Sequence, residues 1–249
     1  MEVHAHTHTE RKRFTHYLWE FFMLFLAVTL GFLVENQREH LVEHQRAKVF
    51  ASNLYDELKK DTSSLNDIIT ENENVVGLLD SLCLFMADQK ERNSRTGMLY
   101  YYSSYTPAVN FFSSNNTTIE QLKSSGNLRI MGNEVSQKIS EYDKRLSDLA
   151  TEYGLSRSEF EKMETLYFRI FDVNVRWNII PDRNKINRDS VFKLNIPLLN
   201  DDDKLIKEYL GWIRFETHIY TLQNSRHLVP LKKFVIELMA LLKKKYHLE

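Results

Sequence analysis

The sequence predicts an all-α protein in which one N-terminal transmembrane helix continues into a long helical stalk. Three observations support this fold class. Residues 21–34 form an uncharged apolar run, the apolar residues after it recur at alternating steps of three and four, and the chain holds only 7 Gly and 4 Pro among 249 residues. Such spacing marks one face of a helix, whereas turns depend on glycine and proline. We therefore expect the stalk to pack into an antiparallel helical bundle or coiled-coil hairpin domain.

The predicted transmembrane anchor covers residues 14–36. Its uncharged core spans roughly 21 Å as a helix, and flanking positions that include Tyr17 and Trp19 extend it to about 20 residues, enough for a hydrocarbon core of about 30 Å. These two rings then lie at headgroup depth, where such rings are enriched. Glu20 is the polar residue embedded in this segment, and we expect its carboxylate to reach the interface. The functional alternative is that it pairs with a partner helix or belongs to a proton pathway.

Basic residues before the span predict its orientation. Arg11, Lys12 and Arg13 precede it directly, and no basic cluster of equal density follows it. By the positive-inside rule, residues 1–13 form a cytoplasmic tail and residues 37–249 an extracytoplasmic domain. We therefore expect a single-pass protein of the inner membrane with a periplasmic domain. A cleaved signal peptide is the alternative, but Glu20 interrupts the layout of such a peptide and no clean Ala-x-Ala site follows, so we favour an uncleaved signal anchor.

Composition narrows the functional classes. The formal net charge is -1, and the basic residues are interleaved with acidic ones, so we expect no nucleic-acid partner. Cys83 is the only cysteine, which excludes an intrachain disulfide. Its place in an apolar heptad run predicts a small buried hydrophobic residue.

The stretch after the span carries one apolar seam with coiled-coil spacing. Two of its positions are polar, Asp61 and Asn72, and a polar Asn at a seam position fixes register at a cost in stability. Asn72 is therefore our candidate for a register-determining residue. The apolar seam residues are Leu54, Leu58, Leu65, Ile68, Val75, Leu79, Leu82 and Met86.

Two segments break the helical pattern and predict irregular connections, residues 87–116 and 177–200. The first contains Gly97, Pro107 and a run of tyrosines and phenylalanines. Rigid aromatic side chains are favoured on binding surfaces, so this segment is either a surface for a partner or ligand, or a cap over the end of the bundle. We favour the cap.

Local signals predict where the remaining helices begin and end. Thr117 and Glu120 form a capping-box pair that opens a short helix, which closes at Gly126. A further helix runs from Asn133 to Gly154.

The last helices have similar signals. Ser156 and Glu159 are expected to cap the helix after Gly154. The acidic residues 201–203 are expected to lie at a helix start, where their charges complement the helix dipole, with a cation site as the alternative. Pro230 is expected to kink or restart the final helix.

One catalytic motif is present, H-x-x-E-H at His40, Glu43 and His44. On a helix the two imidazoles share a face and would together bind one Zn²⁺, while the glutamate would polarise a water molecule. A catalytic zinc also needs a third protein ligand and an open position, and the sequence supplies no recognisable third ligand. We therefore expect a solvated stalk, no metal, no cofactor and no enzymatic activity.

Two further patterns carry a family resemblance. Trp19 and Glu20 lie near the start of the span, Gly31 within it, and Glu35 and Asn36 at its exit. Residues 118–143, TIEQLKSSGNLRIMGNEVSQKISEYD, contain a Leu-x-x-Ser-Gly-Asn-Leu stretch followed by a Tyr-containing helix. In both respects the chain resembles a large uncharacterised family of single-pass membrane proteins of Bacteroidota.

The resemblance implies a membrane anchor and a helical extracytoplasmic domain, with no catalytic residues to transfer. It also implies a helix stop, in which Gly126 supplies a left-handed cap, with a ligand role as the alternative. This motif comprises Ser125, Gly126, Asn127 and Leu128.

These patterns together favour a non-enzymatic scaffold or interaction protein of the cell envelope. Its partners would be the lipid bilayer and either another envelope protein or further copies of the chain, contacted through heptad seams. A sensory helical bundle that binds a small molecule and acts through a membrane partner is the first alternative. A membrane-tethered zinc hydrolase is the second.

Overall fold

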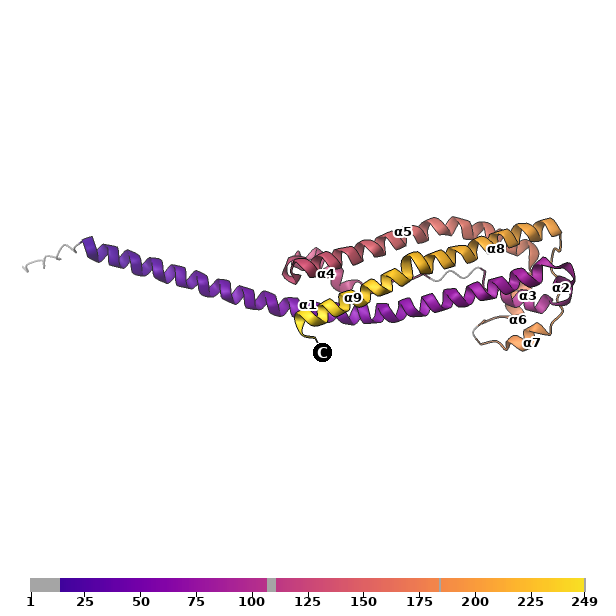
Figure 1. Ribbon diagram of the computed structural model, residues 1–249, viewed down its shortest axis with the longest axis horizontal. Coiled ribbons are helices and arrows are strands. Elements are labelled where there is room, and N and C mark those ends of the chain that lie inside the picture. Colours follow the sequence, from indigo (N-terminus) through magenta and orange to yellow (C-terminus); the bar gives the residue numbers. More distant parts are fainter. Residues whose placement is uncertain (1–13, 107–110, 184, 249) are drawn as a thin grey trace, which may run out of the picture. The chain divides into compact units, whose positions relative to one another are not determined.

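The computed structural model describes residues 14–106, 111–183 and 185–248 (Figure 1). Within these ranges all regular secondary structure is helical, as the sequence predicts, and no strand occurs. The chain divides into two compact units, Met1–Phe50 and Ala51–Glu249. The tail of residues 1–13, including Arg11, Lys12 and Arg13, lies outside the described residues, as does Pro107.

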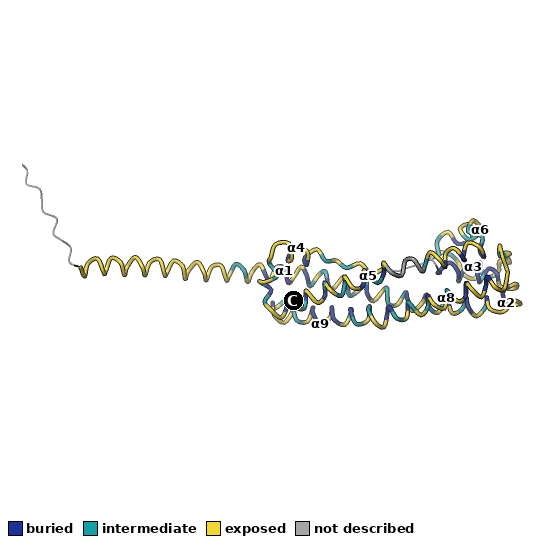
Figure 2. Tube along the Cα trace, turned by 90° about the horizontal axis from the view of Figure 1, so that it is seen from above, coloured by how far each residue is buried: buried dark blue, intermediate teal, exposed yellow. Residues whose placement is uncertain are grey.

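The first unit contains the start of helix α1, Phe14–Ala87. The apolar window of this helix is long and apolar enough to cross a membrane, and none of it is buried (Figure 2). Large apolar side chains are exposed on every side of it, from Phe14 at 79% to Val34 at 68%. Since α1 continues without a break through Ala87, the prediction that the apolar segment and the seam belong to one helix is confirmed.

In the second unit the seam of α1 is buried. Its apolar residues between Leu54 and Met86 are at most 1% exposed except for Ile68, which is partly exposed. Three further long helices lie alongside, α5 (Asn133–Ile170), α8 (Asp203–Gln223) and α9 (Val229–Tyr246), and α5 packs against both α8 and α9 (Figure 1). The seam residues, which recur at steps of three and four, thus form one buried stripe along α1, because only one side of the helix faces the other three.

Both segments that we expected to be irregular contain short helices. The first holds α2 (Gln89–Ser94) and α3 (Thr96–Ser103), and the second holds the end of α6 (Val173–Ile179) and all of α7 (Arg188–Phe192). Helices α3 and α7 pack together. Each is too short to show the periodicity that identifies a helix in sequence.

The aromatic run lies in the core. Tyr100 is fully buried and its ring meets Phe171 edge-on at 5.2 Å, while Tyr101 meets Phe192 at 5.4 Å. A partner surface built on these rings is therefore wrong, although Phe111 is half exposed. Close packing also explains Gly97, where an added Cβ would lie 2.1 Å from the Val191 carbonyl oxygen.

The predicted capping box is wrong. Helix α4 spans Thr117–Ser124, so Thr117 lies inside its first turn, and the preceding Asn116 makes no side-chain cap. Glu57 of α1 caps the helix instead, because its carboxylate accepts hydrogen bonds from the Thr118 amide at 3.1 Å and from the Thr118 hydroxyl at 2.9 Å. A side chain 61 residues earlier thus replaces the local motif.

The predicted helix end at Gly154 is also wrong, because α5 continues through it to Ile170. Among the described glycines only Gly126 and Gly132 have positive φ, so Gly154 does not adopt a left-handed cap. A helical glycine costs about 1 kcal/mol relative to alanine, which the packing of a 38-residue helix offsets. The side chains of Ser156 and Glu159 lie outside the described residues.

Candidate functional site

The zinc-motif residues lie on α1 in the first unit. His40 and His44 are exposed and Glu43 is partly exposed. Among the residues that the structure describes, no group of three or more His, Cys, Asp or Glu side chains is arranged to hold a metal ion. The structure therefore supplies no third ligand for this motif within those residues.

The other two predicted sites have simple geometry. Glu20 lies one turn after His16, with 3.1 Å between its carboxylate and His16 Nε2, and both side chains are about half exposed, at 46% and 48%. In the Ser-Gly-Asn-Leu motif, Gly126 has φ 66° and ψ 12°, the left-handed conformation, between α4 and the short helix η1 (Asn127–Met131). Ser125 and Gly126 are exposed, and Asn127 and Leu128 are partly exposed.

The most distinctive local geometry is a π-helical turn, η2 (Asn224–Leu228), between α8 and α9. Pro230 follows it and has no N–H to donate to the carbonyl four residues earlier, so the regular ladder cannot continue there. The prediction that Pro230 would kink or restart the final helix is confirmed in its second form, because a π-turn follows α8 and α9 begins at Val229 with Pro230 in its first turn. Turns of this kind occur frequently at functional sites.

Buried amide side chains fix the π-turn to α1. Asn224 Nδ2 donates to the Ile69 carbonyl oxygen at 3.0 Å, and Asn224 Oδ1 accepts from Asn72 Nδ2 at 2.9 Å. Asn72 is fully buried. The register role that we predicted for Asn72 thus has a defined partner, the first residue of the π-turn.

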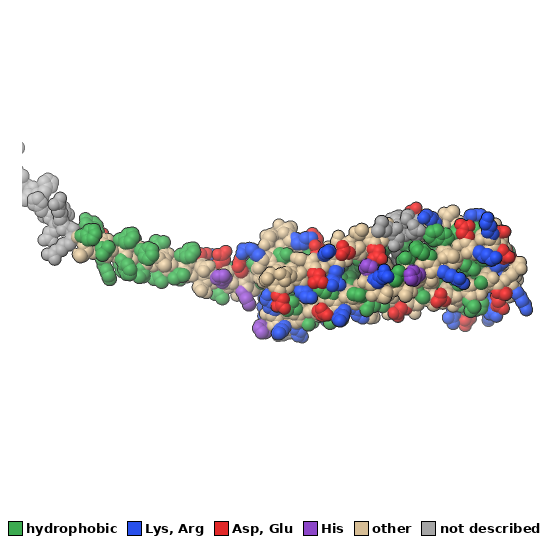
Figure 3. All heavy atoms as spheres, turned by 45° about the horizontal axis from the view of Figure 1, so that its top comes forward, with side chains coloured by type: hydrophobic (Ala, Val, Ile, Leu, Met, Phe, Trp, Pro, Cys, Tyr) green, Lys and Arg blue, Asp and Glu red, His purple; other side chains and the backbone are tan. Residues whose placement is uncertain are grey.

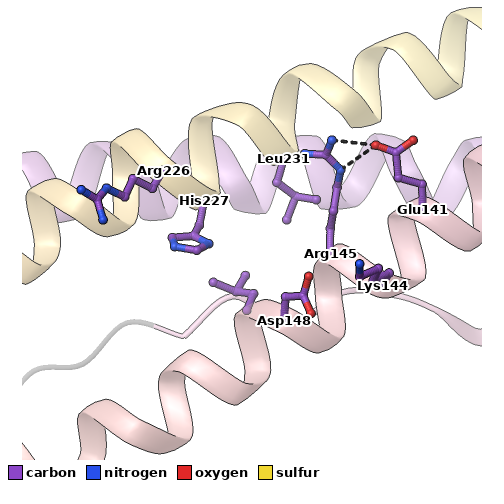
Figure 4. Close-up of a pocket in the computed structure, with 8 residues that line it drawn as sticks. Glu141, Lys144, Arg145, Asp148, Arg226, His227 and Leu231 are labelled. Carbon is purple, nitrogen blue, oxygen red and sulfur yellow. Dashed lines mark hydrogen bonds and ion pairs between the residues drawn. The ribbon is translucent and has the colours of Figure 1, made fainter.

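A groove of about 340 Å³ lies between α5 and the π-turn (Figure 4). Leu149 and Leu231 give it apolar walls. Figure 4 shows His227 pointing from η2 toward α5, with Arg226 further along η2. The polar side chains that line the groove are Glu141, Lys144, Arg145 and Asp148 of α5, and Arg226 and His227 of η2.

Two ion pairs neutralise part of this charge. Arg145 donates two hydrogen bonds to Glu141, at 2.7 and 3.2 Å, and this contact holds the pKa of Glu141 below its usual range. The Arg145 guanidinium also lies 4.5 Å from the centre of the Phe234 ring, a cation–π distance. His227 Nε2 lies 2.7 Å from Glu152 Oε2, with the two side chains 33% and 37% exposed.

Three charged groups in the groove remain uncommitted. Within the part of the chain that the structure describes, the side chains of Lys144, Asp148 and Arg226 form no hydrogen bond or ion pair. All three are exposed at the groove. The groove therefore offers two cations and one anion to a ligand, beside two apolar side chains.

Titratable groups are also buried in the core of the second unit. Glu216 of α8 is 3% exposed, and burial raises its pKa well above the usual range. Tyr142 donates to Asp61 at 2.7 Å, and burial, followed by the charge of Asp61, raises the pKa of this tyrosine. Asp61 is a seam position of α1, Tyr142 lies on α5 and Glu216 on α8, and we assign these groups to the packing of the helices.

Sequence reasoning missed the groove and one buried cation. The groove residues are spread over two segments with no shared motif, and Pro230 was the only signal near them.

Arg92 is the buried cation. It is 1% exposed, donates to Asp201 and, at 2.7 Å, to Asp203, and also donates to the Met86 carbonyl oxygen at 3.0 Å. The expected helix-start role of the acidic triplet falls to Asp202, which accepts from the Leu205 amide.

The comparisons with known proteins add no relative. No family model, no curated protein and no solved structure matches the chain.

Proposed function

We propose that this protein is a single-pass, membrane-anchored helical protein of the cell envelope that works by binding another envelope protein or further copies of itself. Residues 14–36 of α1 would span the inner membrane, residues 1–13 would be cytoplasmic, and residues 37–249 would form a periplasmic antiparallel helical bundle. The mechanism would be placement, in which the anchor holds a helical surface at a set distance from the bilayer.

One observation carries this proposal: the apolar window of α1 is entirely exposed. Exposing so many contiguous large apolar side chains to water is unfavourable, and soluble proteins rarely do so over such an area. A bilayer is the environment that matches an uncharged helix that is apolar on every side.

The charge pattern supports an interaction role for the second unit. Acidic and basic side chains intermix over the face of this unit that Figure 3 shows, whereas hydrophobic side chains cover the first part of α1. A mixed surface of this kind suits specific protein contacts and gives no reason to expect nucleic acid.

Alkaline extraction of membranes from cells that express the full chain tests the anchor. Leu26→Arg should release the protein into the soluble fraction, because a central cation costs about 3 kcal/mol in membrane insertion. Leu41→Arg is the matched control, since Leu41 is exposed on the same helix but lies outside the span. If wild-type protein is extracted as readily as Leu26→Arg, the anchor is refuted.

Crosslinking in native membranes, followed by purification and mass spectrometry, tests the partner. A second protein at near-equal amount, or a crosslinked homo-oligomer, would support the proposal, and a purely monomeric protein without partners would contradict it. The metal content of the same sample tests the zinc hydrolase alternative. Stoichiometric zinc that is lost in His44→Ala would favour that alternative.

The sensory alternative is favoured by one specific observation, the groove with uncommitted charges beside the π-turn. It requires the same anchor, so the extraction experiment does not separate the sensory role from the scaffold role. A ligand that binds in the groove would favour the sensory role.

A further inference from the structure

We propose that the groove between α5 and the π-turn binds an acidic amino acid, either free or as the C-terminal residue of a dipeptide whose N-terminal ammonium supplies the same positive charge. The inference is independent of the scaffold role and supplies a ligand for the sensory alternative. It rests on the charges that remain in the groove once its internal ion pairs are counted.

Once the ion pairs inside the groove are counted, three charged side chains remain without a partner among the described residues. Arg145 is committed to Glu141 and to the Phe234 ring, and His227 is committed to Glu152. The uncommitted charges are then two cations, Lys144 and Arg226, and one anion, Asp148.

An acidic amino acid carries the complementary set of charges, two carboxylates and one ammonium group. Charge-assisted hydrogen bonds between such groups are the strongest polar contacts available to a small ligand. We assign the carboxylates to Lys144 and Arg226, and the ammonium to Asp148. A simple dianion would leave Asp148 opposite a like charge, and a monovalent amine would leave both cations without a partner.

Size and lining agree with this assignment. The groove has a volume of about 340 Å³, within the range of small-molecule sites, so it admits an amino acid with a further residue attached. Leu149 and Leu231 offer apolar contact to the methylene groups between the charged ends. Opposing helices supply the polar groups, with Lys144 and Asp148 on α5 and Arg226 on η2 (Figure 4).

The η2 side of the groove is held in place before any ligand arrives. The Asn224 side chain ties the start of the π-turn to α1 through Ile69 and Asn72. Leu228, at the end of the turn, is fully buried. A backbone ordered in advance lowers the entropic cost of binding, which favours a specific site.

Calorimetric titration of the full chain in detergent with L-glutamate tests the proposal, with glutarate as the comparison ligand because it lacks the ammonium group. We expect saturable glutamate binding and weaker glutarate binding. Lys144→Gln and Arg226→Gln should each weaken glutamate binding roughly tenfold, the usual effect of losing one charge-assisted contact. Lys207→Gln, at an exposed cation of α8, is the matched control and should bind as wild type.

Asp148→Asn gives the sharpest readout. It should abolish the preference for glutamate over glutarate, because the lost carboxylate recognises only the ammonium. A variant that merely unfolded the groove would lose both ligands together. The dipeptide Gly-Glu distinguishes the two ligand sources, since binding tighter than that of glutamate would indicate a dipeptide.

Two outcomes would overturn the inference. One is the absence of saturable binding for both glutamate and Gly-Glu, and the other is binding that Lys144→Gln and Arg226→Gln leave as unaffected as Lys207→Gln does. Neither outcome touches the scaffold role, whose failure would appear in membrane extraction and crosslinking.

Discussion

Asn72 and Asn224 join two segments that are 152 residues apart, through a hydrogen bond of 2.9 Å from Asn72 Nδ2 to Asn224 Oδ1. Asn72 is fully buried on the seam of α1, and Asn224 begins the only π-turn among the described residues. Asn72 Nδ2 also approaches Gln223 Oε1 at 3.5 Å. This amide cluster joins α1 to the α8–α9 segment, and the register role of Asn72 stays a prediction that it supports.

Replacing Asn224 should destabilise the protein. Asn224→Ala removes the 2.9 Å partner of the buried Asn72 amide and the bond to the Ile69 carbonyl oxygen, and poorly satisfied buried polar groups cost about 1–3 kcal/mol. Urea unfolding followed by circular dichroism measures the change. Asn174→Ala, at an exposed asparagine of α6, should change the free energy of unfolding by less than about 0.5 kcal/mol. Equal effects from the two variants would contradict the register role.

Arg92→Ala should destabilise by roughly 2–3 kcal/mol, because the buried guanidinium bonds Asp201, Asp203 and the Met86 carbonyl oxygen. The acid partners are 38% and 65% exposed, so water compensates them in part, and we place the loss below that of a fully buried pair. Thermal unfolding measures it. Arg95→Ala should have little effect, because the Arg95–Glu91 pair is at the surface. If Arg95→Ala destabilised the protein more than Arg92→Ala does, burial of the arginine would not determine how much its ion pairs stabilise the fold.

The buried carboxyl of Glu216 should make stability depend on pH. Its folded-state pKa is raised by burial, so the folded state binds the proton more tightly than the unfolded state. Stability is therefore greatest below the unfolded pKa, about 4.3, and falls as the pH rises from there toward the folded pKa.

Glu216→Gln removes this dependence, so it should raise the melting temperature relative to wild type more at pH 8 than at pH 4.5. Thermal scans at the two pH values measure it, and Glu208→Gln, on the exposed side of α8, is the matched control. If Glu216→Gln changes the melting temperature by the same amount at both pH values, the pKa of this carboxyl does not change on folding.

Two glycines of the second unit should respond to alanine with opposite signs. Gly97→Ala places a Cβ against the backbone oxygens of Val191 and Leu194, at 2.1 and 2.6 Å, and should cost at least about 1–3 kcal/mol. Gly77→Ala meets nothing within 4 Å in the middle of α1 and should stabilise by about 0.5–1 kcal/mol through helix propensity. Denaturant midpoints compare the two. A tolerated Gly97→Ala would show that α3 and α7 separate easily.

The sequence by itself determined the features that depend on local periodicity. The uncharged run marked the membrane-competent part of α1, and the three-and-four spacing from Leu54 to Met86 marked its buried stripe, because helix geometry converts spacing directly into faces. The left-handed residue after α4 is likewise a glycine, Gly126, as local backbone sterics favour. No distant partner is needed for these features.

Only the tertiary structure decided which distant groups meet. Glu57 caps α4 in place of the local motif, Arg92 bonds acidic residues at the start of α8, and α5 passes through Gly154 because packing offsets the propensity of one residue. The groove likewise combines α5 with the π-turn that precedes Pro230, and the Asn224 side chain ties the start of that turn to α1. Propensity and spacing act over a few residues, whereas these contacts join segments separated by tens to hundreds of residues, and their energies exist only once the chain has folded.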